Sequence, residues 1–146
     1  MLPTSTIPST QVSTARLLVV DDSDDDVELL RIALVRTGSR LRLSVATSGE
    51  AALRRLGDET APDLVPLDWN MPGLSGAEVL EAIRGNPATH LLPVFVFSSS
   101  ESPEHRRLAT ALGATGCLPK PADMGGYLGL ARALDSAWCG ATATRA

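Results

Sequence analysis

The sequence predicts an α/β fold, a doubly wound parallel sheet of five strands with five helices covering both of its faces. Three observations predict it. Short apolar runs recur five times, a segment with apolar residues at helical spacing follows each run, and most of the runs are almost continuously apolar. Continuous apolarity is typical of strands that are buried on both faces. The 146 residues suit one domain with one hydrophobic core.

The five predicted strands are residues 16–20, 41–46, 64–68, 93–98 and 116–119. The helix after the first strand is representative, because Val27, Leu30 and Leu34 share one helical face. Pro66 disagrees with its strand, since proline has no N–H to donate to a sheet ladder. Two explanations stay open: a bulge at this residue, or pairing on one side only.

Helix starts and ends carry their own signals. Thr47 and Ser75 each stand three residues before a glutamate, which predicts two capping boxes. Ser102 precedes a proline, which predicts an N-cap with proline at the first helical position. Glycine stands where helices should stop, at positions 38, 85 and 113.

Composition excludes several classes of protein. The net charge of −4 argues against a nucleic-acid or membrane surface. No apolar run approaches the roughly 20 residues that span a bilayer, and no signal peptide pattern opens the chain. Cys117 and Cys139 lack the spacing of a metal site, so we expect reduced thiols and a cytoplasmic protein.

The chain is expected to divide into three parts. Residues 1–15 are rich in Ser, Thr and Pro without charge, which predicts a disordered tail. A single domain is expected over residues 16–140, and a short tail over residues 141–146.

Polar residues stand where the predicted strands end. Asp21 and Asp22 follow the first strand, Asp68 ends the third, Ser98 ends the fourth and Lys120 follows the fifth. Ligands of open α/β sheets bind at these carboxyl ends. Lys120 is also the only lysine among 13 basic residues, the others being arginine. A lone lysine can arise by chance, or it can mark a place that requires a compact ammonium group.

Three carboxylates brought together repel one another unless a cation neutralises them. Carboxylate oxygens, a backbone carbonyl and water are the usual ligands of Mg²⁺, so we expect a magnesium site. The acids that follow, at positions 24–26, are expected in the first turn of a helix, near the positive end of its dipole.

Two other ligand sites fit this stretch poorly. Asp22, Asp24 and Asp26 match the start of a calcium loop, but Val27 stands where the loop needs glycine and Ala33 where it needs glutamate. A nucleotide site would need a glycine-rich turn with free N–H groups, and this turn offers carboxylates.

The motifs LVVDD, LDWNMPGLSG and KP, on five strand–helix units, resemble the receiver domain of two-component response regulators. The resemblance covers about residues 16–138. The stretch PDLVPLDWNMPGLSGAEVLEAIRGNP and the closing SAW are similar to small single-domain receivers that partner phytochrome-type histidine kinases. The resemblance implies a flavodoxin-like sheet with strand order 2-1-3-4-5.

The resemblance implies a role for each site residue. Asp68 is the phosphoacceptor, attacking a phosphoryl group carried on a kinase histidine. Asp22, Asp68 and the backbone carbonyl of Asn70 hold Mg²⁺, while Asp21 acts mostly through water. The Asn70 side chain influences how fast water removes the phosphoryl group. Lys120 pairs with Asp68 at rest and with a phosphoryl oxygen afterwards. The peptide bond between Lys120 and Pro121 is expected to be cis, a form that can aim the lysine side chain.

Ser98 donates its hydroxyl to the phosphoryl group, with Ser99 as the nearest competitor for this role. Trp69 is expected to pack in the core or as a lid. Cys117 departs from the family pattern, which has Tyr or Phe three residues before the lysine. A switch based on the swing of an aromatic ring is therefore doubtful at this position.

The expected function is that of a stand-alone phosphoacceptor in a phosphorelay, not an enzyme with its own substrate. The chain ends soon after Trp138, so output is expected through protein contacts. Tyr127, Leu130 and Trp138 offer surface for a homodimer, although core packing also explains most of them. Two alternatives stay open. One is an adaptor without phosphorylation; the other is a phosphatase, disfavoured because Asn70 stands where haloacid-type enzymes have a second aspartate.

Overall fold

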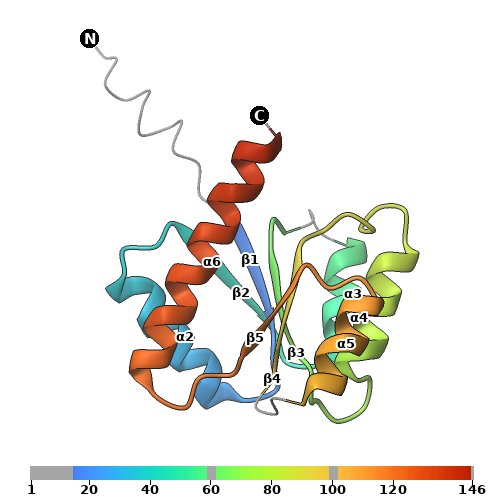
Figure 1. Cartoon of the computed structure of the whole chain (residues 1–146), viewed down its shortest axis with the longest axis horizontal. Coiled ribbons are helices and arrows are strands. Elements are labelled where there is room, and N and C mark those ends of the chain that lie inside the picture. Colours follow the sequence, from blue (N-terminus) through green and yellow to red (C-terminus); the bar gives the residue numbers. More distant parts are fainter. Residues whose placement is uncertain (1–14, 59–61, 99–101, 146) are drawn as a thin grey trace.

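The computed structural model describes residues 15–58, 62–98 and 102–145, so nearly all of the predicted N-terminal tail lies outside the described residues. Its centre is a parallel sheet in the order β2-β1-β3-β4-β5 (Figure 1), which confirms the predicted fold class and strand order. The strands are β1 (Ala15–Val20), β2 (Leu41–Ala46), β3 (Val65–Asp68), β4 (Val94–Ser98) and β5 (Gly116–Pro119).

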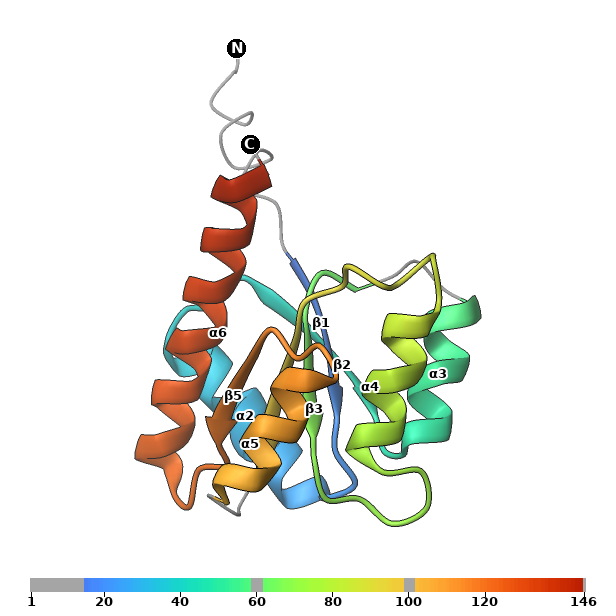
Figure 2. The same ribbon diagram turned by 45° about the vertical axis from the view of Figure 1, so that its right-hand side comes forward.

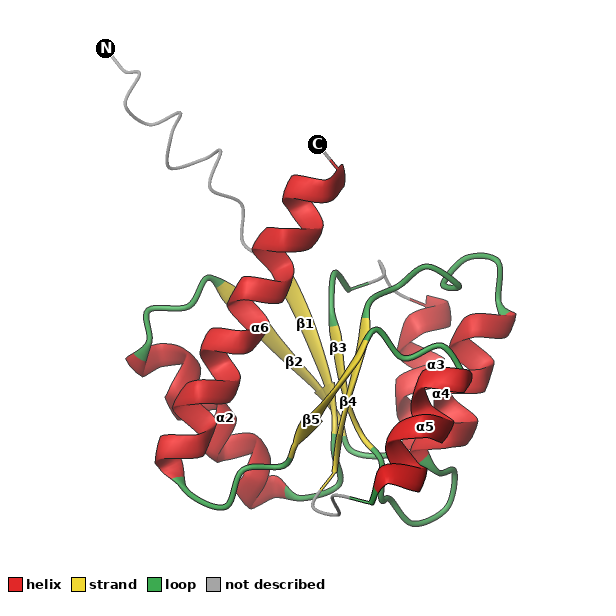
Figure 3. Cartoon of the chain, viewed as in Figure 1, coloured by secondary structure: helices red, strands yellow, loops and turns green. Residues whose placement is uncertain are grey.

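Helices alternate with the strands and form two layers. The helices are α2 (Asp24–Arg36), α3 (Gly49–Asp58), α4 (Gly76–Gly85), α5 (Pro103–Ala111) and α6 (Met124–Arg145). Figure 2 and Figure 3 show α2 and α6 side by side on one face of the sheet, and α3, α4 and α5 on the other.

A hydrophobic core lies on each face of the sheet. Strand β1 contributes side chains to both cores, because successive side chains of a strand point to opposite faces. Leu17 and Val19 pack with Leu30 and Leu134 in the core under α2 and α6. Leu18 and Val20 belong instead to the core under α3, α4 and α5. A strand covered on both faces explains why its sequence is apolar without interruption.

Pro66 lies inside β3 and pairs on one side only. The ladder between β3 and β4 continues through it, with Pro66 opposite Phe95. Toward β1, pairing is limited to a bridge at Leu64 and a partner for Leu67. The missing N–H therefore falls on the β1 side, and of the two open explanations one-sided pairing is correct.

Two of the three predicted helix starts are confirmed. Ser75 forms the capping box of α4, and Ser102 caps α5 with proline in its first turn. The start of α3 was predicted wrongly. Ser48, not Thr47, accepts a hydrogen bond from the N–H of Ala51 at 3.0 Å, because the helix begins one residue later than the pattern indicated.

Helix α6 continues to Arg145, beyond residue 140, where the sequence predicted the end of the domain. Tyr127 and Leu130 are buried in the core under α2 and α6, and Trp138 packs partly buried against it. Core packing therefore accounts for Tyr127 and Leu130, which offer no surface to a second copy. Among the described residues, no helix is long and apolar enough to cross a membrane.

Gly76, the first residue of α4, holds the segment after β3 close to the helix. A Cβ at this position would lie 2.8 Å from the carbonyl oxygen of Asp68 and 2.8 Å from the Cα of Trp69. Both neighbours are backbone atoms that cannot move aside freely. Glycine is therefore required where the chain passes from Asp68 into α4.

Gly76→Ala is expected to lower the free energy of unfolding by about 1–3 kcal/mol, because the added methyl group collides with backbone. Gly57→Ala in α3 is the matched control. A Cβ there meets nothing within 4 Å, and alanine is a better helix former by up to about 1 kcal/mol. Urea unfolding of both variants checks this expectation; equal stability of the two would contradict it.

Candidate functional site

The polar residues predicted at the strand ends do converge. Parallel pairing places Asp68 opposite Phe97, and Ser98 opposite Pro119, the last residue before Lys120. Figure 3 shows the carboxyl ends of β1, β3, β4 and β5 meeting at the lower edge of the sheet. Residues from distant parts of the sequence therefore share one end of the molecule.

Asp21, Asp22 and Asp68 form an acidic cluster. Each offers a carboxylate oxygen, and these oxygens lie within 4.8 Å of one another. Asp21 is 2% exposed and Asp68 is 3% exposed, while Asp22 faces solvent. An all-oxygen donor set that is open on one side fits a hard divalent cation that keeps part of its water.

Lys120 lies among carboxylates. Its Nζ is 3.2 Å from Asp21 Oδ2, 3.2 Å from Asp68 Oδ2 and 2.9 Å from Asp26 Oδ2. The ammonium group also lies 5.5 Å from the centre of the Phe97 ring. Burial alone would lower the pKa of Lys120, but its three carboxylate partners outweigh burial and raise it, so the group stays charged.

The sequence analysis did not predict Asp26 as a site residue. It assigned Asp26 only to the acidic first turn of α2. It does lie in the first turn, where its N–H donates to the N-cap Ser23, but its carboxylate faces inward to Lys120. Position 26 stands four residues before the buried Leu30, on the inner face of the helix. That spacing was the signal available in the sequence.

The aspartates differ in their affinity for protons. Burial raises the pKa of Asp21 to about 6; Asp68 adds to the rise, while the N–H of Ser23 and the charge of Lys120 oppose it. Burial also acts on Asp26, but its hydrogen bond to Lys120 and the charge of that lysine outweigh it, so the pKa of Asp26 is lowered.

Asn70 and Ser98 border the acidic cluster. The backbone N–H of Asn70 donates to Asp68 Oδ1 at 3.2 Å, and its side-chain amide donates to Ser98 Oγ at 3.2 Å. Ser98 is buried at the end of β4. The roles expected for the Asn70 carbonyl and the Ser98 hydroxyl stay predictions. Ser99, the expected competitor, lies outside the described residues.

The expected cis bond between Lys120 and Pro121 is wrong, since no described peptide bond is cis. The lysine is aimed in another way. Its N–H donates to the carbonyl of Ser98 at 2.8 Å, so the pairing of β5 with β4 continues through Lys120. The strand ladder fixes the backbone of Lys120, and the three carboxylates hold its ammonium group.

Cys117 is half-buried and its thiol is free. It lines a small cavity together with Trp69, Ser98 and His105. Trp69 is buried in the core under α3, α4 and α5, which confirms the packing expected for it. The position that holds a ring in the resembled family therefore holds a small side chain beside Ser98.

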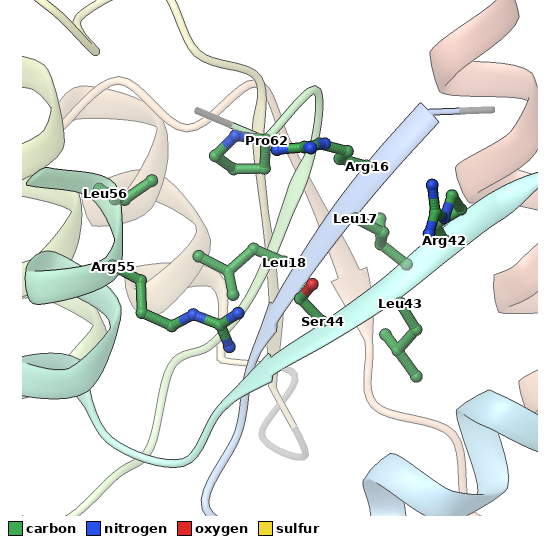
Figure 4. A pocket seen from close by; sticks show the side chains of 9 residues that line it. All are labelled: Arg16, Leu17, Leu18, Arg42, Leu43, Ser44, Arg55, Leu56 and Pro62. Carbon is green, nitrogen blue, oxygen red and sulfur yellow. The ribbon is translucent and has the colours of Figure 1, made fainter. Parts of the chain in front are cut away.

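A second cavity, of about 240 Å³, lies apart from the acidic cluster near the other end of β1 and β2. Arg16, Arg42 and Arg55 line it. Figure 4 shows their guanidinium groups spread around the cavity, Arg16 beside Pro62 and Arg55 reaching from α3. They do not converge on one point, so no ligand is assigned to it.

Comparison with known proteins agrees with this geometry. The sequence model of the response regulator receiver domain matches residues 17–128. The chain therefore belongs to the response regulator receiver domain family, the signalling domain of two-component systems. A relative in Vibrio cholerae, a "Probable cyclic di-GMP phosphodiesterase", is 36% identical over 110 residues, which make up 75% of this chain and 24% of that protein. The chain thus spans about a quarter of this relative's length.

Two solved response regulators are similar over nearly their whole length. The Mn²⁺-bound form of Rcp1 has a TM-score of 0.76 and 26% identity, covering 85% of this chain and 94% of that one. RPA3017, described in red light signaling of R. palustris, has a TM-score of 0.73 and 31% identity, covering 85% and 91%. Receiver domains bind a divalent metal at an acidic pocket, and this chain has an acidic cluster formed by Asp21, Asp22 and Asp68.

The raised pKa of Asp21 predicts a pH dependence of stability without metal. A folded pKa of about 6 against an ordinary 3.8 means that the folded state holds the proton more tightly. The stability that this proton contributes is present below the ordinary value and is lost as pH rises through about 6. Wild type should therefore gain stability relative to Asp21→Asn as pH falls from about 7.5 to about 5.

Urea unfolding in a metal chelator, at several pH values, measures this difference. Asp22→Asn is the control, because Asp22 is exposed in the same loop. A difference between wild type and Asp21→Asn that stays constant with pH would contradict the assignment.

Proposed function

We propose that this chain receives a phosphoryl group on Asp68 from the phosphohistidine of a histidine kinase, with Mg²⁺ as cofactor. One observation carries the proposal. A buried carboxylate, Asp68, lies 3.2 Å from the only lysine of the chain and within 4.8 Å of two further carboxylates. This set provides a nucleophile, a cation for a phosphoryl oxygen and ligands for a metal.

The proposed reaction is an in-line displacement at phosphorus. A carboxylate oxygen of Asp68 attacks, an O–P bond forms and the P–N bond to the kinase histidine breaks. The imidazole keeps the electron pair of that bond and takes up a proton. Lys120 neutralises charge on a phosphoryl oxygen, where a compact ammonium group suits a small trigonal group. Ser98, at the end of the neighbouring strand, donates its hydroxyl.

The charge balance of the site supports the metal. Asp21, Asp22, Asp26 and Asp68 face a single ammonium group, that of Lys120. Asp21, Asp22, Asp68 and the backbone carbonyl of Asn70 would hold Mg²⁺. The ion would neutralise charge on both the carboxylates and the transferred group.

The partner proposed is a histidine kinase of the phytochrome type, and output runs through protein contacts in the cytoplasm. The support is the similarity to RPA3017, a response regulator of red light signaling, together with the matched motifs. A homodimer is one form that this output can take. Because Tyr127 and Leu130 are buried, a dimer would have to use other residues.

Phosphorylation is tested by mixing the protein with acetyl phosphate and Mg²⁺ and measuring intact mass over time. Wild type is expected to gain one phosphoryl group transiently. Asp68→Asn should gain none, because the nucleophile is gone. Lys120→Arg should gain far less, because a wide planar guanidinium group replaces the compact ammonium. Melting temperatures of the variants show that they remain folded.

Two results would overturn the proposal. No gain of mass with acetyl phosphate or with any phosphorylated kinase would favour an adaptor that keeps the fold alone. Rapid, sustained consumption of donor would favour an Asp68-dependent phosphatase.

A further inference from the structure

Asp26 connects the acidic cluster to the layer formed by α2 and α6. Its carboxylate makes the shortest contact of Lys120, 2.9 Å against 3.2 Å to Asp21 and Asp68. Asp26 lies outside the group of oxygens that can share a metal ion. It therefore competes for the lysine without belonging to the metal site.

Tyr127 lies on the other side of Asp26, in the first turn of α6. Its ring is 2% exposed, and its hydroxyl is buried without a hydrogen-bond partner among the described residues. Burial and the nearby carboxylate of Asp26 raise the pKa of Tyr127, so the hydroxyl keeps its proton. The carboxylate is close enough to act on the hydroxyl, but the two groups do not meet in the geometry of a hydrogen bond. A buried hydroxyl without a partner is unfavourable, and the carboxylate beside it is a strong acceptor.

Lys120 would have different binding partners in the resting and in the phosphorylated protein. At rest its ammonium group is shared among Asp21, Asp26 and Asp68. A phosphoryl group on Asp68 would add negative charge at one of these partners and draw the ammonium toward it. Asp26 would then lose its nearest cation. Its side chain is 30% exposed, so water and the Tyr127 hydroxyl on its buried side are the donors that remain for its carboxylate.

We propose that Asp26 exchanges donors on phosphorylation: Lys120 binds its carboxylate at rest, and the Tyr127 hydroxyl binds it once Lys120 turns to the phosphoryl group. Asp26 thus acts as a positioning residue for Lys120 and passes the change of state to α6. This inference rests on the proposed function. It also gives the chain a route of activation where Cys117 replaces the ring of the resembled family.

The chain contains a single tyrosine, which makes the exchange directly observable. Tyrosine labelled with carbon-13 at the ring carbon bearing the hydroxyl gives one NMR resonance, from Tyr127. That resonance is expected to shift when mass spectrometry shows phosphorylation. In Asp26→Asn, phosphorylation should still occur and the shift should be lost. Lys120→Met should move the resonance without any donor, since it removes the cation from Asp26.

The outcomes separate this inference from the proposed function. A protein that is phosphorylated while its tyrosine resonance stays in place, or shifts equally in Asp26→Asn, overturns the exchange and leaves phosphorylation intact. A protein that is never phosphorylated overturns the proposed function. The Lys120→Met spectrum still tests the pairing of Asp26 in that case, and an unchanged resonance there overturns it.

A second measurement addresses the competition for Lys120. Asp26→Asn should lengthen the lifetime of the phosphorylated form about fivefold, because a charge-assisted competitor for the ammonium is removed. Asp25→Asn is the matched control, since Asp25 is exposed in the same helical turn and changes the net charge equally. Equal lifetimes in the two variants overturn the competition.

Discussion

The ammonium group of Lys120, surrounded by carboxylates, holds together the residues at the carboxyl ends of the strands. Lys120 contacts Asp21, Asp26 and Asp68 at once, and these four residues come from the beginning, the middle and the end of the domain. Without the ammonium group, buried Asp21 and Asp68 would repel each other across a short distance in a poorly solvated place. The surplus of negative charge that remains around Lys120 is what a divalent ion would neutralise. Fold stability and proposed chemistry therefore depend on the same contacts.

The sheet supplies the precision that this cluster needs. Parallel strands in the order β2-β1-β3-β4-β5 bring the ends of β1, β3, β4 and β5 to one edge. The hydrogen bond from the N–H of Lys120 to Ser98 continues the last ladder, and Gly76 lets the chain after Asp68 turn back against its own backbone. Lys120 and the chain after Asp68 are thus held by backbone contacts next to a buried core, which suits the proposed binding of a small, highly charged group.

The two helical layers place different kinds of side chain next to the site. On the side of α5, Cys117 leaves a small side chain beside Ser98, and a cavity stands there. On the side of α2 and α6, Asp26 contacts Lys120, and the unpartnered hydroxyl of Tyr127 is buried near Asp26 in the helix layer. Polar side chains therefore extend from the site toward α6, whereas on the α5 side position 117 carries no aromatic ring.

The sequence by itself determined the fold class, because continuous apolar runs and helical spacing follow directly from burial on two faces. It also determined which residues stand at the strand ends, since chain order places Asp21, Asp68, Ser98 and Lys120 there. Only the tertiary structure decided which side chains touch. The inward turn of Asp26, the trans bond after Lys120 and the cap at Ser48 depend on packing between distant segments or on a shift of one residue. Local patterns describe the chain's periodicity, whereas contacts across the sheet arise only when the strands are assembled.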